Sequence, residues 1–230
     1  MSCNEQLRKT VSIIVKNNWF RGGDSGMTEK IDRRKAKTKQ ALREAFVALI
    51  KEKGLETITV SDLTRKANIN RGTFYLHYRD VLDLREHFKA EVQEGLLRIV
   101  AHLEPRDMFN QALEGKVYDG LIRLYEYFDS QADFFEVMLG QNGDLSFSVL
   151  MKETIHSHMY HKLIESQVQN VLLVPADILI GYVSSAHFGF ILEWIRHGRQ
   201  QTPAELAKYM CTIMYHGPLR ALGFLPPKTT

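Results

Sequence analysis

Cysteine is scarce in this sequence of 230 residues, which contains only Cys3 and Cys211. Two cysteines this far apart in the sequence provide neither a disulfide framework nor the spacing of a zinc site. The sequence also has no internal repeat and no low-complexity tract. The scarcity of cysteine therefore argues against a small disulfide-stabilised secreted domain and predicts a protein of the reducing cytoplasm.

Long hydrophobic runs are absent as well. The longest apolar stretches, 171–174 and 188–192, fall far short of the roughly 20 residues that a membrane helix requires. Leu7–Phe20 has a basic flank, but Ser12 interrupts its apolar patch and no small-residue cleavage site follows, so it does not fit a secretory signal. The sequence thus predicts no membrane partner.

The glycine-rich run at 22–26 predicts a flexible tail over residues 1–27, because glycine leaves the backbone free to adopt many conformations. Met27 directly follows this run. We therefore expect Met27, rather than Met1, to be the natural start. The intact mass of the native protein tests this expectation, which fails if residues 1–26 are present.

Motifs of catalysis are also missing. The sequence contains no nucleophile elbow, phosphate-binding glycine loop or zincin motif, and no alternating α/β pattern that would support one. His156, His158 and His161 lie close together with Glu165, but no second ligand pair accompanies them, so we expect no metal. Cys211 lies among apolar residues, where a thiol is usually inert. We therefore expect neither an enzyme nor a bound cofactor.

The charges that are present are unevenly distributed, although the formal net charge is only +3. Residues 28–79 carry 13 basic and six acidic side chains, whereas residues 80–230 carry 13 basic and 19 acidic ones. The hydrophobic fraction of 44% is ordinary for a globular protein. A basic head on an acidic body is typical of a phosphate-binding module joined to a domain that does not bind nucleic acid.

Apolar residues recur at helical spacing along the basic head. They predict an amphipathic helix over 33–53, ended by Gly54. A short second helix follows, with Thr59 as its N-cap and Asp62 three residues later, and it stops near Asn68. Asn70 is the expected N-cap of a third helix, and Asp80 is the expected N-cap of a fourth. The first three of these helices are expected to form a three-helix DNA-binding domain over residues 28–80, and the fourth begins the next domain.

The rest of the chain also reads as helices, because no convincing alternating strand pattern appears. We expect them at 81–103, 107–129, 131–139, 146–169, 175–198 and 203–216. Glycines and prolines between these segments mark the boundaries. The predicted fold class is all-α, with a C-terminal helical ligand-binding and dimerisation domain over residues 81–220 and a tail over 221–230.

Residues 59–78 have the pattern of a helix-turn-helix, in which a small shared core fixes one helix so that it enters the major groove. The expected core comprises Val60, Leu63, Ala67, Ile69 and Phe74. Asn68 occupies the turn position that needs a left-handed backbone, which asparagine tolerates best after glycine. The outward positions of the third helix combine hydrogen-bond donors with no acidic charge, as a DNA-reading surface requires: Arg71, Gly72, Thr73, Tyr75, Leu76 and His77.

The run TVSDLTRKANINRGTFYLHY at 59–78 resembles the signature of the TetR family of transcriptional regulators, and the resemblance extends over about residues 31–92. It implies a DNA-binding dimer that responds to a small-molecule effector. It also implies that Thr73, Tyr75 and His77 contact phosphates or bases and that Thr59 and Ser61 meet the DNA backbone. Further phosphate or minor-groove contacts are implied for the basic stretch of Arg33, Arg34, Lys35, Lys37 and Lys39.

Two positions depart from the family pattern. Asn68 replaces the usual turn glycine, which conserves the geometry. Val81 stands where the family has a lysine that meets a phosphate, and an apolar side chain cannot make that contact. Arg79 is the expected substitute. A packed helical hairpin without DNA-binding function is the alternative interpretation of this segment.

The later helices supply a predicted dimer interface and a predicted pocket. Gly181, Ser185 and Gly189 form a smooth stripe that lets another helix approach closely. The resemblance implies that the last two long helices pair with their symmetry mates, and Leu206, Met210 and Ile213 give the last of them its apolar face. A role in the intramolecular core is the alternative. The middle and later helices also carry many large rings, which could line a pocket for an apolar ligand or could equally fill the core. The rings proposed for the pocket are Phe109, Tyr118, Tyr125, Phe128, Tyr160, His187 and Trp194.

The function predicted from these features is a ligand-responsive repressor that binds a pseudo-palindromic operator as a homodimer. We expect such a protein in the cytoplasm, associated with the nucleoid when it is bound to DNA. One alternative is a DNA-bound adaptor whose C-terminal half binds a protein partner, and another is an activator. A roomy apolar cavity would favour the sensor, and a closed core would favour the adaptor.

Overall fold

The structure is a computed structural model that describes residues 25–166 and 172–224. Most of the predicted tails, at 1–24 and 225–230, lie outside the described residues. The described chain is all-helical and contains no strand, which confirms the predicted fold class. Its helices are α2 (Ser25–Lys53), η1 (Leu55–Thr57), α3 (Val60–Lys66), α4 (Arg71–Tyr75), α5 (Val81–Val100), α6 (Pro105–Leu113), α7 (Asp119–Ser130), α8 (Ala132–Met138), α9 (Leu145–Glu165), α10 (Ala176–Arg196), α11 (Pro203–His216) and α12 (Pro218–Ala221).

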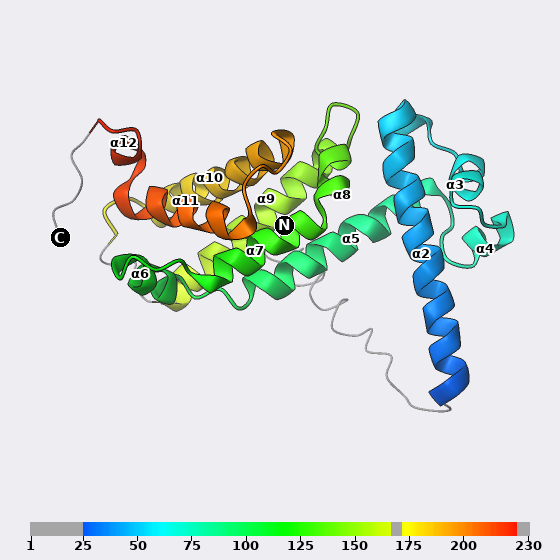
Figure 1. Cartoon of the computed structure of the whole chain (residues 1–230), viewed down its shortest axis with the longest axis horizontal. Coiled ribbons are helices and arrows are strands. Elements are labelled where there is room, and N and C mark those ends of the chain that lie inside the picture. Colours follow the sequence, from blue (N-terminus) through cyan, green and yellow to red (C-terminus); the bar gives the residue numbers. More distant parts are fainter. Residues whose placement is uncertain (1–24, 167–171, 225–230) are drawn as a thin grey trace, which may run out of the picture. The chain divides into compact units, whose positions relative to one another are not determined.

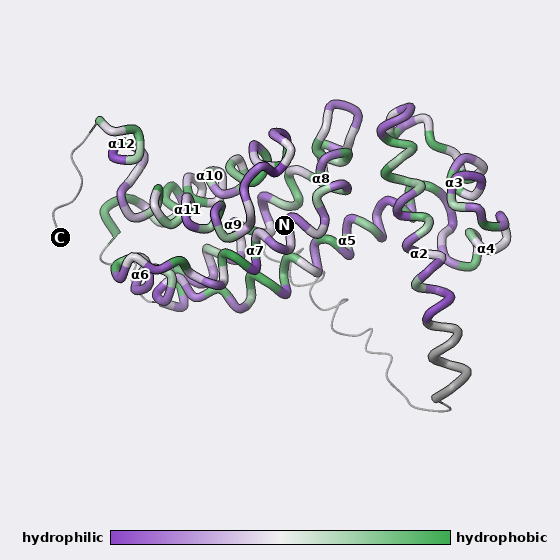
Figure 2. The backbone as a smooth tube through the Cα atoms, viewed as in Figure 1, coloured by the Kyte–Doolittle hydropathy of each residue, from purple (hydrophilic) through white to green (hydrophobic). Residues whose placement is uncertain are grey.

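Helix α2 begins at Ser25, earlier than the predicted start at Arg33. The sequence between residues 27 and 40 contains no glycine or proline, so nothing in it interrupts the helical backbone. The described chain divides into two compact units between Gln40 and Ala41. The side chains of residues 33–37 are exposed and hydrophilic, and Figure 2 shows this stretch of α2 in purple.

Within the larger unit, one hydrophobic core runs from the short helices of the head into the helical body. Phe46 of α2, Phe74 of α4 and Phe88 of α5 are fully buried. The ring of Phe88 lies 5.8 Å from that of Phe46 and 6.4 Å from that of Phe134 in α8. Helix α5 contributes side chains to this core along most of its length, and Figure 1 shows its path from α4 towards α7.

Packing in the body is arranged around α5, α7 and α9. Helix α5 packs against α7 and α9, α10 packs against α9 and α8, and α11 packs against α7 and α6. The buried aromatic rings of Phe128, Phe135 and Phe147 link α7, α8 and α9, with ring centroids 4.9 and 5.6 Å apart. Truncating one such ring to alanine typically costs about 3–5 kcal/mol, so this cluster contributes strongly to the stability of the body.

The structure divides the single helix predicted over 107–129 into α6 and α7. Gly115 adopts a left-handed φ of 69°, and the N–H of Lys116 donates to the carbonyl of Gln111 at 2.8 Å. This six-residue closure is the Schellman motif that ends a helix at glycine. The prediction of one continuous helix was therefore wrong, because hydrophobic periodicity resumes after the turn and hides the break.

Candidate DNA-binding surface and ligand cavity

The first helix of the helix-turn-helix, α3, begins with a capping box. The Thr59 hydroxyl accepts a hydrogen bond from the N–H of Asp62 at 3.2 Å, and the Asp62 carboxylate accepts one from the N–H of Thr59 at 3.0 Å. Lys53 lies 2.5 Å from the same carboxylate. These hydrogen bonds, that from Lys53 first, hold the pKa of Asp62 far below its ordinary value. The predicted cap is confirmed, and Ser61 lies exposed beside it.

The turn between α3 and α4 has the geometry predicted from Asn68. Its φ is +52°, in the left-handed region. The N–H of Ile69 then donates to the carbonyl of Thr64 at 3.0 Å, which closes the Schellman motif at the end of α3. Ile69 packs against the hydrophobic core from a partly buried position. The turn therefore fixes the path by which the chain enters α4.

Asn70 is the N-cap of α4, as predicted. Its side-chain oxygen accepts a hydrogen bond from the N–H of Gly72 at 2.8 Å. Phe74 is fully buried and Tyr78 is 7% exposed, so these two rings anchor the helix to the core. The residues predicted to face DNA lie on the other side: Arg71, Gly72 and Tyr75 are exposed, and Thr73 and His77 are partly exposed. The helix thus presents a mixed donor and aromatic surface to solvent.

Leu76 is the most exposed apolar side chain of this surface, at 82% of its area. It directly follows Tyr75, which is 53% exposed. The hydrophobic effect disfavours such an exposed leucine unless another surface covers it. In the major groove, the C5-methyl group of thymine is the apolar feature that such a side chain contacts. Sequence reasoning placed Leu76 outward but did not include it among the contact residues.

The junction after α4 departs from the family pattern at Val81, which is partly buried against the core. Arg79, the expected substitute, has an 86% exposed side chain, and its guanidinium lies 3.0 Å from the Asp83 carboxylate. Asp83 also accepts the N–H of Arg79 at 3.0 Å. This pairing raises the pKa of Arg79 and lowers that of Asp83. Arg79 must therefore share its charge between Asp83 and any phosphate that it meets.

A partly buried guanidinium joins α2 to α5 and α8. Arg43 of α2 lies over the ring of Phe134 at 4.6 Å and over that of Phe88 at 5.6 Å. It also donates to the side-chain oxygen of Gln131 at 2.5 Å, and Glu91 lies 3.6 Å away. Burial lowers the pKa of Arg43, while Glu91 opposes that shift. Arg43 was not identified from the sequence, because a single arginine on a basic helix carries no signal of burial.

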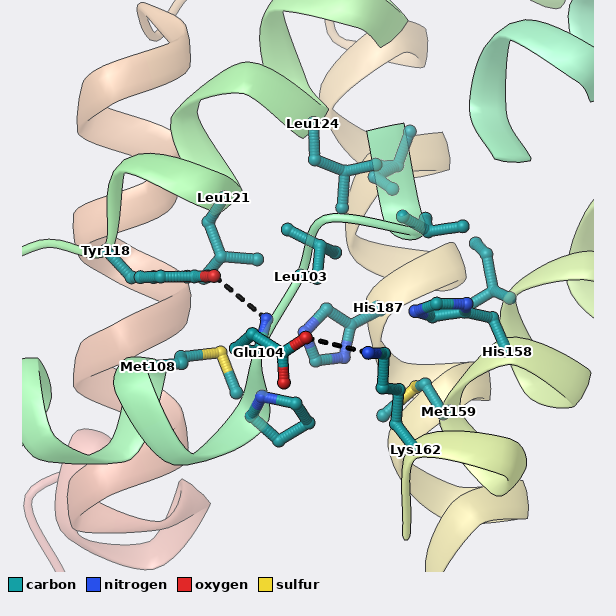
Figure 3. Close-up of a pocket in the computed structure, with 14 residues that line it drawn as sticks. Leu103, Glu104, Met108, Tyr118, Leu121, Leu124, His158, Met159, Lys162 and His187 are labelled. Atoms are coloured by element: carbon teal, nitrogen blue, oxygen red, sulfur yellow. Dashed lines mark hydrogen bonds and ion pairs between the residues drawn. The ribbon is translucent and has the colours of Figure 1, made fainter. Parts of the chain in front are cut away.

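The body contains a cavity of about 70 Å³ between the end of α5, the start of α6, and helices α7, α9 and α10. Figure 3 shows its wall, on which most side chains are apolar. The lining residues are Val100, Leu103, Glu104, Pro105, Met108, Tyr118, Leu121, Leu124, Ile155, His158, Met159, Lys162, His187 and Ile191. The cavity therefore joins the far end of α5 to four other helices.

The predicted pocket residues separate into three groups. Tyr118 and His187 lie on the cavity wall. Tyr125, Phe128 and Trp194 are buried among core residues and do not line the cavity. Tyr160 is 40% exposed on α9, and the side chain of Phe109 lies outside the described residues.

Tyr125 combines burial with an unsatisfied polar atom. Its hydroxyl oxygen is buried and has no hydrogen-bond partner among the described residues. Burial strongly raises the pKa of this phenol, so it stays neutral. The aromatic body of Tyr125 packs near the ring of Phe190 at 6.3 Å.

His158 and Lys162 of α9, with Glu104, are the polar wall residues that sequence reasoning missed. Lys162 Nζ lies 2.7 Å from Glu104 Oε1, an ion pair that Figure 3 marks with a dashed line. The Nε2 atom of His158 is buried and has no hydrogen-bond partner among the described residues. Burial, and then the nearby charge of Lys162, lowers the pKa of His158. No metal-binding group of three residues is found in the part of the chain that the structure describes.

The outer face of α10 is apolar but uncovered in the single chain. The predicted interface stripe of Gly181, Ser185 and Gly189 lies there, and a Cβ added at either glycine meets no atom within 4 Å. Ile178 and Tyr182, on the same helix, are 63% and 60% exposed. By length and composition α10 could cross a membrane, and 39% of its apolar window is buried in the fold. A single helix of this kind is weak evidence for a span, because the core helix of a protein without any membrane segment has the same length and composition.

Helix α11 contributes unequally to the predicted interface. Leu206 and Met210 are 3% and 4% exposed and pack within the chain, whereas Ile213 is partly exposed. Tyr209 is 48% exposed. The surface open to a partner on α11 is therefore narrower than the predicted set.

Two regions of the chain match known family profiles. Residues 39–86 match one described as bacterial regulatory proteins, tetR family, and residues 115–216 match one described as a transcriptional regulator C-terminal region. The uncharacterized HTH-type transcriptional regulator YxbF of Bacillus subtilis (strain 168) is 39% identical over 82 residues. That match covers 35% of this chain but only 21% of YxbF, so the chain spans about a fifth of this relative.

Solved structures share the fold over most of the chain. A TetR transcriptional regulator from Streptococcus agalactiae 2603V is 25% identical with a TM-score of 0.53, and the match covers 82% of this chain and 98% of that one. FadR, a fatty acid degradation regulator from Bacillus halodurans, is 16% identical with a TM-score of 0.52 and respective coverage of 79% and 96%. NalD of Pseudomonas aeruginosa, a secondary repressor of the MexAB-OprM efflux pump, is 18% identical with a TM-score of 0.50 and respective coverage of 80% and 97%.

Proposed function

This chain belongs to the TetR family of bacterial transcriptional regulators, and from this premise we propose that it is a ligand-responsive repressor that binds a pseudo-palindromic operator as a cytoplasmic homodimer. The observation that carries the proposal is the surface of α4. Arg71, Tyr75 and Leu76 face solvent, while buried Phe74 fixes the helix in the core. An α-helix held in this way fits the major groove, which is about 12 Å wide.

Phosphate contacts are proposed for the residues that surround α4 and for the basic start of α2. Arg33, Arg34 and Lys37 are exposed and lie on a stretch without acidic neighbours between residues 33 and 43. Thr59 and Ser61 lie at the start of α3. Such contacts position a protein on DNA, whereas base contacts from Thr73, Tyr75 and His77 would specify the sequence.

Dimerisation is supported by the uncovered face of α10. A helix of mean hydropathy 1.4 that is only partly buried needs a covering surface, and a second copy of the same glycine stripe permits close approach. A two-fold dimer also reads two half-sites, about 34–36 Å or a multiple of that distance apart. One short recognition helix alone contacts too few base pairs for specificity.

Ligand release follows from the position of α5. Its last residue, Val100, lines the cavity, and its first turns pack against Tyr78 through Phe88, whose rings lie 6.1 Å apart. A ligand that favours a displaced α5 changes the placement of α4, so the half-site spacing no longer matches the operator. By linkage, the affinity for DNA then falls by the same factor as the preference of the ligand for the released state.

The size of the cavity bears on the alternative of a protein-binding adaptor. Its 70 Å³ is smaller than the roughly 300–1,000 Å³ of drug-sized sites, but the core is not closed. An open cavity with charged and unpaired polar groups on its wall favours a small effector over a purely packed adaptor core. Repression, rather than activation, is the usual mode of the family.

DNA selection followed by a release assay tests the proposal. Full-length protein is used to enrich duplexes from a random library, and binding to the enriched duplex is then followed by fluorescence anisotropy with and without a cell metabolite extract. We expect an enriched pseudo-palindrome and a loss of binding in extract. Enrichment without any effect of extract, combined with capture of a specific protein, would instead support the adaptor.

A further inference from the structure

The two charged side chains on the cavity wall differ in exposure: the cation is mostly shielded from solvent, and the anion is mostly exposed. Lys162 and Glu104 are the only charged side chains that line the cavity among the described residues. The Lys162 side chain is 20% exposed, whereas that of Glu104 is 52% exposed. Glu104 can therefore turn into water at little cost, while Lys162 stays in the wall. Glu165 also lies 3.7 Å from Lys162 Nζ, but its side chain is 67% exposed and does not line the cavity. On the wall itself, the charge that a ligand head group meets once Glu104 has turned away is therefore positive.

Two further polar groups beside this ion pair have unused hydrogen-bonding capacity. The Nε2 atom of His158, one helical turn before Lys162 on α9, is buried without a partner. The Tyr118 hydroxyl accepts the N–H of Glu104 at 2.9 Å, and no described residue accepts its own hydrogen. A buried polar atom without a partner costs about 1–3 kcal/mol, so a ligand that supplies the missing partner recovers that cost.

The remaining polar wall residue, His187, is oriented by a hydrogen bond to the backbone of its own helix. Its Nδ1 lies 2.9 Å from the carbonyl oxygen of Val183, which assigns the proton to Nδ1. Burial lowers the pKa of His187, so the ring stays neutral. The other nine wall residues are apolar, and they form the larger part of the lining around Met108, Leu121 and Ile155.

We propose that the cavity binds an apolar carboxylic acid, whose carboxylate replaces Glu104 at Lys162 Nζ and accepts a hydrogen bond from His158 Nε2, with its hydrocarbon part among the apolar wall residues. The proposal names the effector class of the ligand-responsive function proposed above, and it rests on that function. A cationic ligand fits poorly, because it would meet the ammonium of Lys162 across a low-dielectric space. A neutral alcohol leaves Lys162 paired with Glu104 and gains only one hydrogen bond.

The size of the cavity limits the hydrocarbon part. A cavity of about 150 Å³ holds one benzene molecule with its six carbon atoms, so a cavity of about 70 Å³ accommodates an apolar group of about three carbon atoms. Glu104 directly precedes α6, and its release from Lys162 frees the start of that helix. Longer chains therefore bind only if α6 moves, and short acids are expected to bind best.

Isothermal titration of the full-length protein without DNA tests this inference directly. The probes are sodium butyrate, pentanoate, hexanoate and octanoate, with 1-pentanol and 1-pentylamine as matched neutral and cationic compounds. We expect pentanoate to bind at least tenfold more tightly than pentanol, and pentylamine not to bind. Equal affinity for acid and alcohol, or a preference for the amine, would overturn the proposal.

Substitutions of Lys162 separate charge from packing. Lys162→Met retains a linear side chain without the charge, and we expect it to lower the affinity for pentanoate at least tenfold and to leave the affinity for pentanol unchanged. Lys162→Arg should retain acid binding. Lys152→Met, at an exposed position of the same helix, is the matched control. Unchanged acid binding by folded Lys162→Met, checked by circular dichroism, would contradict the assigned role.

The effect of pentanoate on DNA binding distinguishes this inference from the proposed function. Acid binding that depends on Lys162 but leaves DNA affinity unchanged would support the ligand class and contradict release by ligand. Release of DNA by a metabolite extract, combined with no binding of any tested acid, would support the function and reject the ligand class.

Discussion

Leu76 shows how a single side chain extends the predicted recognition surface. It directly follows Tyr75 at the end of α4, and 82% of its area is exposed in the part of the chain that the structure describes. No local pattern separated Leu76 from the other outward residues, because its exposure depends on the short length of α4. Once the helix is seen to end at Tyr75, the following leucine lies at its open end.

We expect Leu76 to contact a thymine methyl group in the operator. Leu76→Ala should then lower the affinity for the operator by about 1 kcal/mol, a several-fold effect. Replacing that thymine with uracil removes the methyl group and should weaken the wild type by a similar factor. Fluorescence anisotropy titration of wild type and Leu76→Ala on the thymine and uracil duplexes measures the coupling between the Leu76 side chain and the thymine methyl group.

The alanine variant should not distinguish thymine from uracil at that position. Leu97→Ala, at a 38% exposed leucine in α5, serves as the control and should bind like the wild type. An equal loss from uracil in wild type and Leu76→Ala would show that Leu76 does not read the methyl group.

Residues of the cavity wall were only partly predictable. Tyr118 and His187 were identified because large rings were taken as the marker of a pocket, and both lie on the wall. His158 and Lys162 were missed, because α9 carries apolar residues on several faces and the sequence does not show which face turns towards α6 and α7. Only the packing of α9 against α5 and α10 reveals it.

Asn68, by contrast, was predictable from local chemistry alone. A helix that ends in a Schellman motif needs one left-handed residue, and asparagine is the commonest choice after glycine. Its observed φ of +52° agrees with that requirement. Caps at Thr59, Asn70 and Asp80 were predictable for the same reason, since each satisfies N–H groups that the first helical turn leaves unpaired.

At the scale of elements, α5 and α9 are held together by a buried ion pair. Lys89 Nζ lies 2.9 Å from the Asp144 carboxylate, and the two side chains are 8% and 11% exposed. Asp144 also caps α9 by accepting the N–H of Ser146 at 2.9 Å. Burial raises the pKa of Asp144, but hydrogen bonds from Ser146 and Lys89 and the charge of Lys89 outweigh it and bring the pKa to about 2.

This depressed pKa predicts a specific loss of stability in acid. A carboxylate whose pKa is lower in the folded state stabilises the protein above its unfolded pKa of about 4, and that stabilisation disappears as the pH falls towards 2. Asp144→Asn keeps a capping side chain without the charge. We expect it to lower the free energy of unfolding by about 2 kcal/mol at pH 7, because Lys89 loses its charge-assisted hydrogen bond to Asp144 and keeps only Glu86 at 3.2 Å and the Ser146 hydroxyl at 2.9 Å.

Urea denaturation at pH 7, 4 and 3 measures this difference. The gap between wild type and Asp144→Asn should narrow as the pH falls from 4 to 3, and Glu126→Gln, at an exposed position of α7, should show no such trend. A gap of constant size across these pH values would show that the charge of Asp144 is not the stabilising feature.

The division of the predicted helix 107–129 into α6 and α7 shows where hydrophobic periodicity does not reveal a helix boundary. Apolar residues on both sides of Gly115 keep a helical spacing, so the pattern alone favours continuity. The left-handed φ of Gly115 ends α6, and α7 begins anew at Asp119. The break matters for function, because it lets α6 and α7 line the cavity from different directions.

At the scale of the whole molecule, the outer face of α10 predicts the oligomeric state. Gly181 has open space where a side chain would stand, so Gly181→Arg should fold normally and disrupt close helix pairing in a dimer. We expect sedimentation equilibrium to show a shift from dimer to monomer and a large loss of operator affinity. Asn110→Arg, at an exposed position of α6, is the matched control.

A dimer that persists in Gly181→Arg at micromolar concentration would place the interface elsewhere. Such a result would leave the DNA-binding surface of α4 intact but would remove the reason proposed for the apolar character of α10.

The all-helical fold was predictable because the hydrophobic pattern, the caps and the turn residues agree along most of the chain. The connection between head and body was not. Arg43 stacks on Phe88 and Phe134, three residues far apart in the sequence, and no local pattern marks their meeting. Long-range packing of this kind can be read only from the folded chain.

The central claim is that α4, presented by a dimer, reads specific DNA. The most direct test is an anisotropy titration of full-length protein against the selected pseudo-palindromic duplex and a scrambled duplex, over a range of salt concentrations, with Tyr75→Ala and His77→Ala in parallel. We predict saturation at two subunits per duplex, affinity that falls as salt rises, preference for the selected duplex of at least about a thousandfold, and loss of that preference in both variants. Equal affinity for the two duplexes at every salt concentration, unchanged in both variants, would contradict the claim.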